Sequence, residues 1–293
     1  MKRIFCFYAV AAMFFVSCSS SNGFLATVPE VYDLETGELL SPSKAGRSAG
    51  VYGELSADMF DSRQSISFVR FNPEKYCLTV VSAEEDQADS TSALCVRNGA
   101  VAGINGSYFN VQELTNTTYV KDDGFQTGEF YPREAFRTNG ALFIGMDEIR
   151  IDPIDTTAAW NGGEAWWEAL ASGPVLVDEG IPAEYEEGIP GWRKFYNKRH
   201  PRSIVGTDAQ GYVWLVVVDG RFPGEGEGMT VAELTALSME MGLTDALNLD
   251  GGGSSTLWTL SGGVLNHPYD NHRFDHEGQR IVPNILAVTR NDK

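Results

Sequence analysis

Short apolar runs separated by glycine-rich and polar turns dominate the chain after about residue 48. The runs with β-branched or alternating character predict strands. They cover residues 66–71, 76–81, 101–104, 141–144, 175–177, 203–206, 213–218, 246–249 and 285–289. Residues 230–242 predict a helix, because Thr230 and Glu233 form a capping box and Gly242 supplies the stop. The polar, aromatic stretch from about 110 to 137 predicts a long surface loop.

The order strand 213–218, helix 230–241, strand 246–249 predicts a parallel βαβ unit within residues 213–250, with a right-handed crossover. We therefore expect a single domain of mixed α+β or α/β class, in which a mixed twisted sheet contains this unit and carries flanking helices. The two strands are followed by Asp219-Gly220 and Asp250-Gly251. Parallel strands would bring both pairs to one sheet edge, where α/β folds bind ligands.

The N-terminus predicts export. Lys2 and Arg3 precede a short apolar run that ends near Val16, which is typical of a signal peptide over residues 1–17. Cys18 follows directly, as at a bacterial lipoprotein cleavage site, and would carry lipid; simple secretion is the alternative. Residues 18–47, rich in Ser, Gly and Pro, would form a flexible tether, and residues 48–293 the domain. The expected location is the cell envelope, with the lipid anchor as the only membrane contact.

Charge narrows the choice of partners. Without residues 1–17 the chain has 40 acidic and 20 basic residues, a net charge of −20. Such a surface repels nucleic acid, so an anionic ligand would need a local basic cluster. Cys77 and Cys95 remain after export, and they form either a disulfide or two buried thiols.

The segment DGGGSS, residues 250–255, is the strongest chemical signal. Its glycines Gly251, Gly252 and Gly253 predict a nest of backbone N–H groups for an anion, and Ser254 and Ser255 add hydroxyl donors. The alternative is that the glycines only let two backbones pack closely.

Two arginines near the same predicted edge strengthen the anion hypothesis. Arg202 follows His200 and Pro201 just before a strand, and Arg221 follows Asp219. Arginine can hold a phosphoryl group through two parallel hydrogen bonds. Asn105, at the end of another predicted strand, caps a turn or contacts a sugar hydroxyl.

Together the motifs INGSYFN, SGPVLV, HPRSIVG, VVVDGR and ALNLDGGGSSTL, in this order, resemble the phosphodiester glycosidase family over roughly residues 101–288. The resemblance implies hydrolysis of a sugar-1-phosphodiester of the N-acetylglucosamine-1-phospho type at the glycosidic C–O bond. It releases free sugar and a phosphomonoester. The partner would be a sugar phosphodiester or an envelope glycan.

The resemblance also implies roles for the site residues. Arg202, Arg221 and the segment 251–255 would neutralise the phosphate as charge develops. Asp219 or Asp250 would stabilise positive charge on the sugar or activate water, and His200 would be a proton shuttle or a structural residue. Asn105 and Asn248 would contact sugar hydroxyls.

A divalent metal remains open as a cofactor. His267, His272 and His276 stand among acidic residues late in the chain, but their spacing matches no structural zinc pattern, and a solvated polar loop is favoured. Tryptophans could stack on sugar rings, although packing roles are the expectation for most; they are Trp160, Trp166, Trp167 and Trp192.

Two other function classes compete with the glycosidase. One is a non-catalytic lipoprotein that binds carbohydrate or another polymer. The other is a phosphodiesterase that cleaves the P–O bond, which usually requires an evident cluster of metal ligands.

Overall fold

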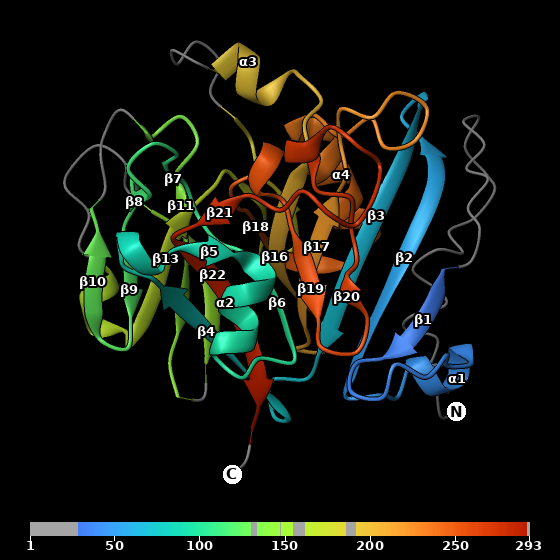
Figure 1. The fold of residues 1–293 in the computed structure, drawn as a ribbon, viewed down its shortest axis with the longest axis horizontal. Coiled ribbons are helices and arrows are strands. Elements are labelled where there is room, and N and C mark those ends of the chain that lie inside the picture. The colour runs from blue at the N-terminus through green and yellow to red at the C-terminus, as the bar shows by residue number, and fades with distance from the viewer. Residues whose placement is uncertain (1–28, 130–133, 147, 155–161, 186–191, 292–293) are drawn as a thin grey trace, which may run out of the picture.

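The computed structural model describes residues 29–129, 134–146, 148–154, 162–185 and 192–291 (Figure 1). The predicted signal peptide, Cys18 and Trp160 lie outside these residues. Among the helices of the described residues, none is long and apolar enough to cross a membrane. The expected tether is partly folded, because β1 (Glu30–Asp33) pairs with β2 (Gly50–Met59) and α1 (Pro42–Ala45) lies between them.

The architecture is mainly β, and every strand pair in the described chain is antiparallel. The largest sheet has the order β1-β2-β3-β17-β16-β18-β14-β15. Besides β1 and β2 it contains β3 (Ser62–Phe71), β14 (Val175–Asp178), β15 (Ile181–Pro182), β16 (Arg202–Asp208), β17 (Val213–Val218) and β18 (Leu243–Asn248). The predicted mixed sheet with a parallel βαβ unit is therefore wrong.

The physical reason is a local hairpin. Strand β16 turns directly into β17, and the Asp208 carboxylate accepts hydrogen bonds from the N–H groups of Gln210 and Tyr212 in the turn. The hairpin leaves the other edge of β16 to pair with β18, so β16 separates the two strands predicted to be neighbours. Because β16 is antiparallel to both, β17 and β18 still run in the same direction, and their carboxyl ends lie at one edge.

Two smaller sheets pack against the large one. One has the order β20-β19-β6-β22-β4 and the other β10-β9-β13-β11-β12. The bounds of their strands are β4 (Tyr76–Ser82), β6 (Ala102–Asn105), β9 (Val120–Asp122), β10 (Phe125–Gly128), β11 (Gly140–Ile144), β12 (Ile149–Pro153), β13 (Glu168–Ser172), β19 (Leu257–Thr259), β20 (Gly263–Val264) and β22 (Asn284–Arg290). In Figure 1 the blue hairpin β2–β3 lies at one side of the molecule and the green strands β9 and β10 at the other.

Two-stranded pairings and short helices complete the fold. They are β5 (Asp89–Ser90) with β21 (Ile281–Val282), β7 (Phe109–Asn110) with β8 (Thr115–Asn116), α2 (Thr91–Arg97), α3 (Trp192–Tyr196) and α4 (Val231–Glu240). Helix α4 confirms the predicted capping box of Thr230 and Glu233. The stretch predicted as one long loop contains β7 to β10.

The side chains of β17 point alternately to the two faces of the large sheet, and a core lies on each face. All six residues of β17 are buried. Val213, Leu215 and Val217 face the core shared with the small sheets, whereas Trp214, Val216 and Val218 face a second core that includes Leu234 and Leu237 of α4. A strand that is buried on both faces has a continuous apolar sequence. Strands of parallel sheets have the same pattern, and for this reason the sequence pattern led to the wrong prediction of a parallel βαβ unit.

Of the two alternatives for Cys77 and Cys95, the structure has the thiols rather than the disulfide. Cys77 on β4 and Cys95 on α2 are both thiols. Cys95 is buried, and burial raises the pKa of its thiol to about 12. At neutral pH Cys95 therefore stays protonated and acts as a small apolar side chain.

Strand β4 lies at an edge of its sheet, and carboxylates take the place of a further strand there. The N–H of Val80 donates to Glu168, and the N–H of Ser82 donates to Asp122 at 2.8 Å. Burial raises the pKa of Glu168 from 4.5 to about 7, although the bond from Val80 opposes the shift. The contact between the two small sheets therefore depends on a carboxyl group that titrates near neutrality.

We predict that Glu168→Gln flattens the dependence of stability on pH. A carboxyl whose pKa is raised by folding stabilises the protein fully below its unfolded pKa, and this contribution is lost as the pH rises through about 7. The parent should lose on the order of 2 kcal/mol from this group between pH 5 and pH 8. Urea unfolding at both pH values measures the difference, and Glu38→Gln, at an exposed carboxyl, is the control. An unchanged pH slope in the Glu168 variant would refute the assignment.

Candidate functional site

A cavity of about 440 Å³ opens at the sheet edge where β17 and β18 end and β16 begins. Its walls come from segments that are far apart in the sequence. The lining residues are Tyr108, Phe136, Arg137, Lys194, Phe195, His200, Pro201, Arg202, Arg221, Asp250, Gly251, Gly252, Gly253 and Arg280. The structure therefore gathers Asp250, His200, both predicted arginines and the glycine run around one cavity.

Basic side chains dominate this cavity, although the whole chain has a net charge of −18. Arg202 and Arg221 were predicted. Arg137, Lys194 and Arg280 were not, because they lie in segments without regular periodicity, and only the fold brings them to this edge. Asp250 is the one carboxylate among the lining residues. The cavity therefore suits an anionic ligand with a single acidic group of the protein beside it.

Arg202 is almost fully buried, and backbone carbonyls hold it. Its Nε donates to the carbonyl of Met229 at 3.0 Å, and one terminal nitrogen donates to the carbonyl of Phe195 at 2.6 Å. Burial lowers the pKa of Arg202 to about 10, so the side chain is still charged at neutral pH. Neutral carbonyls leave its positive charge uncompensated, and the charge is available to the cavity.

Arg221 and His200 form a second basic pair. A terminal nitrogen of Arg221 donates to Nδ1 of His200 at 3.3 Å, and Nε2 of His200 lies 3.1 Å from the carbonyl of Lys194. Burial lowers the pKa of His200, and the charges of Arg202 and Arg221 act in the same direction. A neutral imidazole with its proton on Nε2 fits both contacts, so His200 orients the guanidinium of Arg221.

Asp250 is partly buried at the floor of the cavity. Burial raises the pKa of its carboxyl, while the hydrogen bond from Ser254 and the charges of Arg137 and Arg280 oppose the shift. The N–H of Gly251 donates to its Oδ1 at 2.9 Å. A carboxylate with a raised pKa is a stronger base than a solvated one, which suits proton transfer.

Close backbone contacts explain why glycines stand at the two Asp-Gly turns. A Cβ on Gly220 would collide with the backbone of Pro201, and a Cβ on Gly251 would lie 2.5 Å from the Pro201 carbonyl oxygen. The chain that leads into β16 therefore passes between the two turns. Gly252 has φ +65°, and a Cβ on Gly253 would overlap the Asp270 and Arg280 side chains. Close packing of two backbones therefore accounts for Gly251, whereas Gly252 has a positive φ and Gly253 gives room to two side chains.

Protein acceptors already occupy several amides of the predicted anion nest. The N–H of Gly251 donates to Asp250, that of Gly252 to the carbonyl of Pro201 at 3.0 Å, and that of Ser254 to the carbonyl of Gly251 at 3.2 Å. The glycine run instead brings two guanidinium groups close to its backbone, since Arg221 lies against Gly252 and Arg280 against Gly253. Basic side chains, more than free backbone amides, therefore line the cavity.

The predicted sugar ligands Asn105 and Asn248 are fully buried behind the cavity. Asn105 donates to the carbonyl of Asp250 at 2.6 Å and accepts from the Ser203 hydroxyl at 2.7 Å. Ser203 also donates to Ser255, which is buried as well. Asn248 donates to the carbonyls of Gly173 and Leu249. These side chains hold the loop that carries Asp250 and do not line the cavity.

Asp219 also lies outside the cavity lining. It is 1% exposed and accepts four hydrogen bonds, from the Ser65 hydroxyl, the Asn266 amide, and the backbone and ring N–H of His267. The His267 ring stacks on Phe274 at 3.6 Å between centroids. Asp219 thus anchors the 266–280 loop, which carries the Arg280–Asp270 ion pair to the cavity rim.

The histidine-rich segment is largely an exposed loop, as predicted: His272 and His276 are exposed, and His267 is partly buried. His276 lies 4.5 Å from His267, ring to ring, and its Nδ1 is 3.0 Å from the Asn266 carbonyl. No group of three or more His, Cys, Asp or Glu side chains placed to hold a metal ion occurs within the described residues.

Comparison with known sequences identifies relatives. Residues 98–289 match the profile of the phosphodiester glycosidase family. The N-acetylglucosamine-1-phosphodiester alpha-N-acetylglucosaminidase of Bos taurus is 29% identical over 185 residues, which are 59% of this chain and 33% of that protein. The Mus musculus protein of the same name is 28% identical over 151 residues, 50% of this chain and 28% of the relative. The chain thus matches about a third of the length of these relatives.

A solved structure supports the fold. The catalytic domain of the zebrafish N-acetylglucosamine-1-phosphodiester alpha-N-acetylglucosaminidase, described as auto-inhibited by its pro-peptide, superposes with a TM-score of 0.66 at 16% identity. The superposition covers 90% of this chain and 88% of that one. At this identity the likeness shows a shared fold.

We predict that Asp219→Asn destabilises the protein by about 2–4 kcal/mol, because an amide nitrogen would face groups that donate to the carboxylate. Thermal or urea unfolding measures the loss, with Asp58→Asn, at a side chain that is 70% exposed, as the control. If Asp219→Asn unfolds like the parent, then this carboxylate does not anchor the 266–280 loop.

Proposed function

Because the chain belongs to the phosphodiester glycosidase family, we propose that it hydrolyses a sugar-1-phosphodiester at the glycosidic C–O bond. The observation that carries the proposal is the cavity itself, in which five basic side chains surround one carboxylate of raised pKa. The names of the bovine and mouse relatives specify an N-acetylglucosamine-1-phosphodiester, and we extend the same bond class to this chain.

The phosphodiester group lies between Arg221, Lys194 and Arg202 in this proposal. The other two basic side chains already have acidic partners, since Arg137 binds Glu134 and Arg280 binds Asp270. Arg221, Lys194 and Arg202 have no carboxylate partner among the described contacts. They therefore supply most of the electrostatic attraction for the phosphodiester group. Their charge stabilises the phosphate more as the C–O bond breaks, because negative charge then grows on the leaving oxygen.

Asp250 acts on the sugar side of the bond. Its carboxylate takes a proton from a water molecule whose oxygen attacks the anomeric carbon. The electron pair of the breaking C–O bond passes to the phosphate oxygen, so the products are free sugar and a phosphomonoester. A phosphate is a weakly basic leaving group, so a second carboxylate acting as general acid is not required, in contrast to ordinary glycosides.

Aromatic side chains shape the remaining wall. Phe195 packs edge-on against Tyr108 and Phe136, with centroids 6.2 and 5.9 Å apart. The guanidinium of Arg137 lies 4.2 Å from the centre of the Tyr108 ring. This wall holds Arg137 near Asp250 and gives the sugar ring an apolar surface beside the charged phosphate site.

We predict that Asp250→Asn lowers kcat by about 10²–10⁴-fold, the range expected when a general base is lost. Affinity for inorganic phosphate, measured by calorimetric titration, should stay the same or improve, because a negative charge has been removed beside the anion. Turnover is measured on an N-acetylglucosamine-1-phosphodiester, and Asp58→Asn is the control.

Turnover within tenfold of the parent would contradict the role of Asp250. An unmutated protein that binds several sugar phosphodiesters but turns none of them over would instead favour the non-catalytic binding protein.

A further inference from the structure

Trp167 is a large aromatic side chain fixed at the surface far from the cavity described above. It is 61% exposed. Its indole N–H donates to Asp123 at 2.9 Å, and a Cβ on Gly124 would lie 3.5 Å from its six-membered ring. The N–H of Gly124 also donates to the Trp167 carbonyl at 2.9 Å. The ring is therefore exposed and held in one orientation, which lowers the entropy cost of binding a ligand on it.

This ring borders a hollow of about 620 Å³. The hollow is lined by Lys121, Gly124, Gly145, Met146, Glu164, Ala165, Trp166 and Trp167. Trp166 is partly buried and packs against Phe143 of a small core cluster, with ring centroids 5.3 Å apart. Met146 is 86% exposed. The hollow thus combines an oriented aromatic ring, a flexible apolar side chain and a few polar groups, the composition typical of ligand sites.

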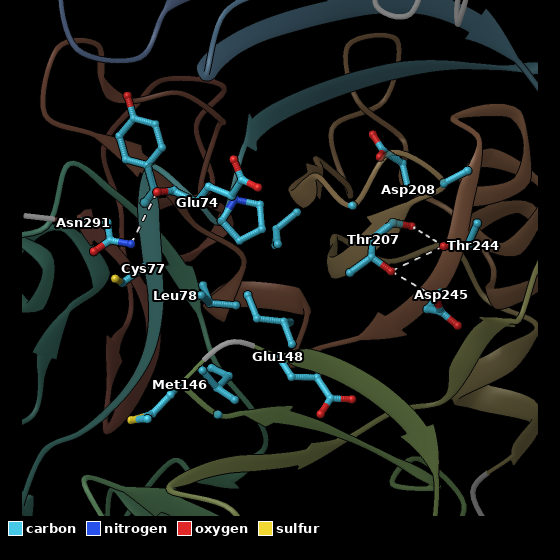
Figure 2. Close-up of a pocket in the computed structure, with 18 residues that line it drawn as sticks. Glu74, Cys77, Leu78, Met146, Glu148, Thr207, Asp208, Thr244, Asp245 and Asn291 are labelled. Carbon is cyan, nitrogen blue, oxygen red and sulfur yellow. Dashed lines mark hydrogen bonds between the residues drawn. The ribbon is translucent and has the colours of Figure 1, made fainter. Parts of the chain in front are cut away.

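A larger cavity of about 820 Å³ continues from the hollow, because both are lined by Gly145 and Met146. Figure 2 shows this second cavity, with labelled side chains around it from β4, from the β11–β12 turn, from the end of β16 and from the start of β18. Glu148, Thr207 and Asp245 supply oxygen atoms to its wall. The two hollows adjoin at Gly145 and Met146, and together we call them the tryptophan groove.

The tryptophan groove lies away from the basic cavity. Arg137 precedes β11 and lines the basic cavity, whereas Gly145 follows β11 and lines the groove. The five residues of β11 (Gly140–Ile144), at about 3.3 Å each, put roughly 16 Å of strand between these two positions, and no residue lines both sites. A ligand in the groove is therefore distinct from the group that would occupy the basic cavity.

We propose that the tryptophan groove binds an uncharged glycan chain, with one sugar ring stacked on Trp167. The apolar face of a pyranose ring matches an indole ring, and sugar hydroxyls donate to carboxylate and threonine oxygens. The charge of the lining favours this class over anionic polymers, because Glu74, Glu148 and Asp245 face the larger cavity without a basic residue among its lining residues. The groove would hold the protein on a polymer while the basic cavity acts on phosphodiester groups.

The test is a calorimetric titration of the parent protein with N-acetylchito-oligosaccharides and linear glucans of two to six residues. Trp167→Ala should weaken binding at least tenfold, and Trp167→Phe should restore most of it. Phe125→Ala, at a side chain that is 74% exposed on the β9–β10 hairpin whose turn holds Trp167, but outside the groove lining, should leave the affinity unchanged. Glu148→Ala should weaken binding of the six-residue chains more than of the disaccharides, because it lies in the farther cavity.

Several results would overturn the proposal. They are no binding of these glycans by the parent, equal binding by Trp167→Ala, or binding lost in Arg221→Ala instead. A change in oligomeric state with Trp167→Ala, seen by light scattering without any change in glycan affinity, would assign the surface to contact between copies of the chain. Because the readout is binding, failure here leaves the proposed hydrolysis standing.

Discussion

The pairing of β16 with a strand on each side is the constraint on which the rest of the molecule depends. Both edges of β16 are hydrogen-bonded, to β17 and to β18, along nearly its whole length. This fixes Arg202 at the start of β16 beside the turns that follow its two neighbours. The segment His200–Pro201 must then pass between Gly220 and Gly251, and neither position tolerates a Cβ. The glycines of the site are therefore required by the protein's own backbone, and the cavity is a consequence of that close approach.

Burial and hydrogen bonding give Asp219 and Asp250 different roles. Asp219 is saturated by four donors and holds a loop, whereas Asp250 is partly exposed to the cavity, and burial raises its pKa. Arg202 keeps its charge because its partners are neutral carbonyls. An acidic chain can in this way attract an anion locally. The tryptophan groove differs from the basic cavity in the charge of its lining. Its larger cavity is lined by acidic residues and by no basic residue.

The capped helix and the strands β3, β4, β6, β11, β14, β16, β17, β18 and β22 could be predicted because their apolar patterns are local, and so could the shared edge of Asp219 and Asp250. Strands β2, β12 and β13 were not predicted. The neighbour of β17 could not be predicted, because a buried antiparallel strand and a buried parallel strand have the same apolar pattern. Arg202 and Arg221 adjoin strands and could be predicted, but Arg137, Lys194 and Arg280 reach the cavity only through tertiary contacts. Asn105 and Asn248 are polar residues at strand ends, and sequence does not distinguish a buried anchor from a ligand contact.

Hydrolysis of an N-acetylglucosamine-1-phosphodiester in oxygen-18 water tests the central claim most directly, because the position of the label shows which bond breaks. The account predicts that mass spectrometry finds the label in the free sugar, since water attacks the anomeric carbon beside Asp250. Label in the phosphomonoester would contradict it and would establish a phosphodiesterase that cleaves the P–O bond.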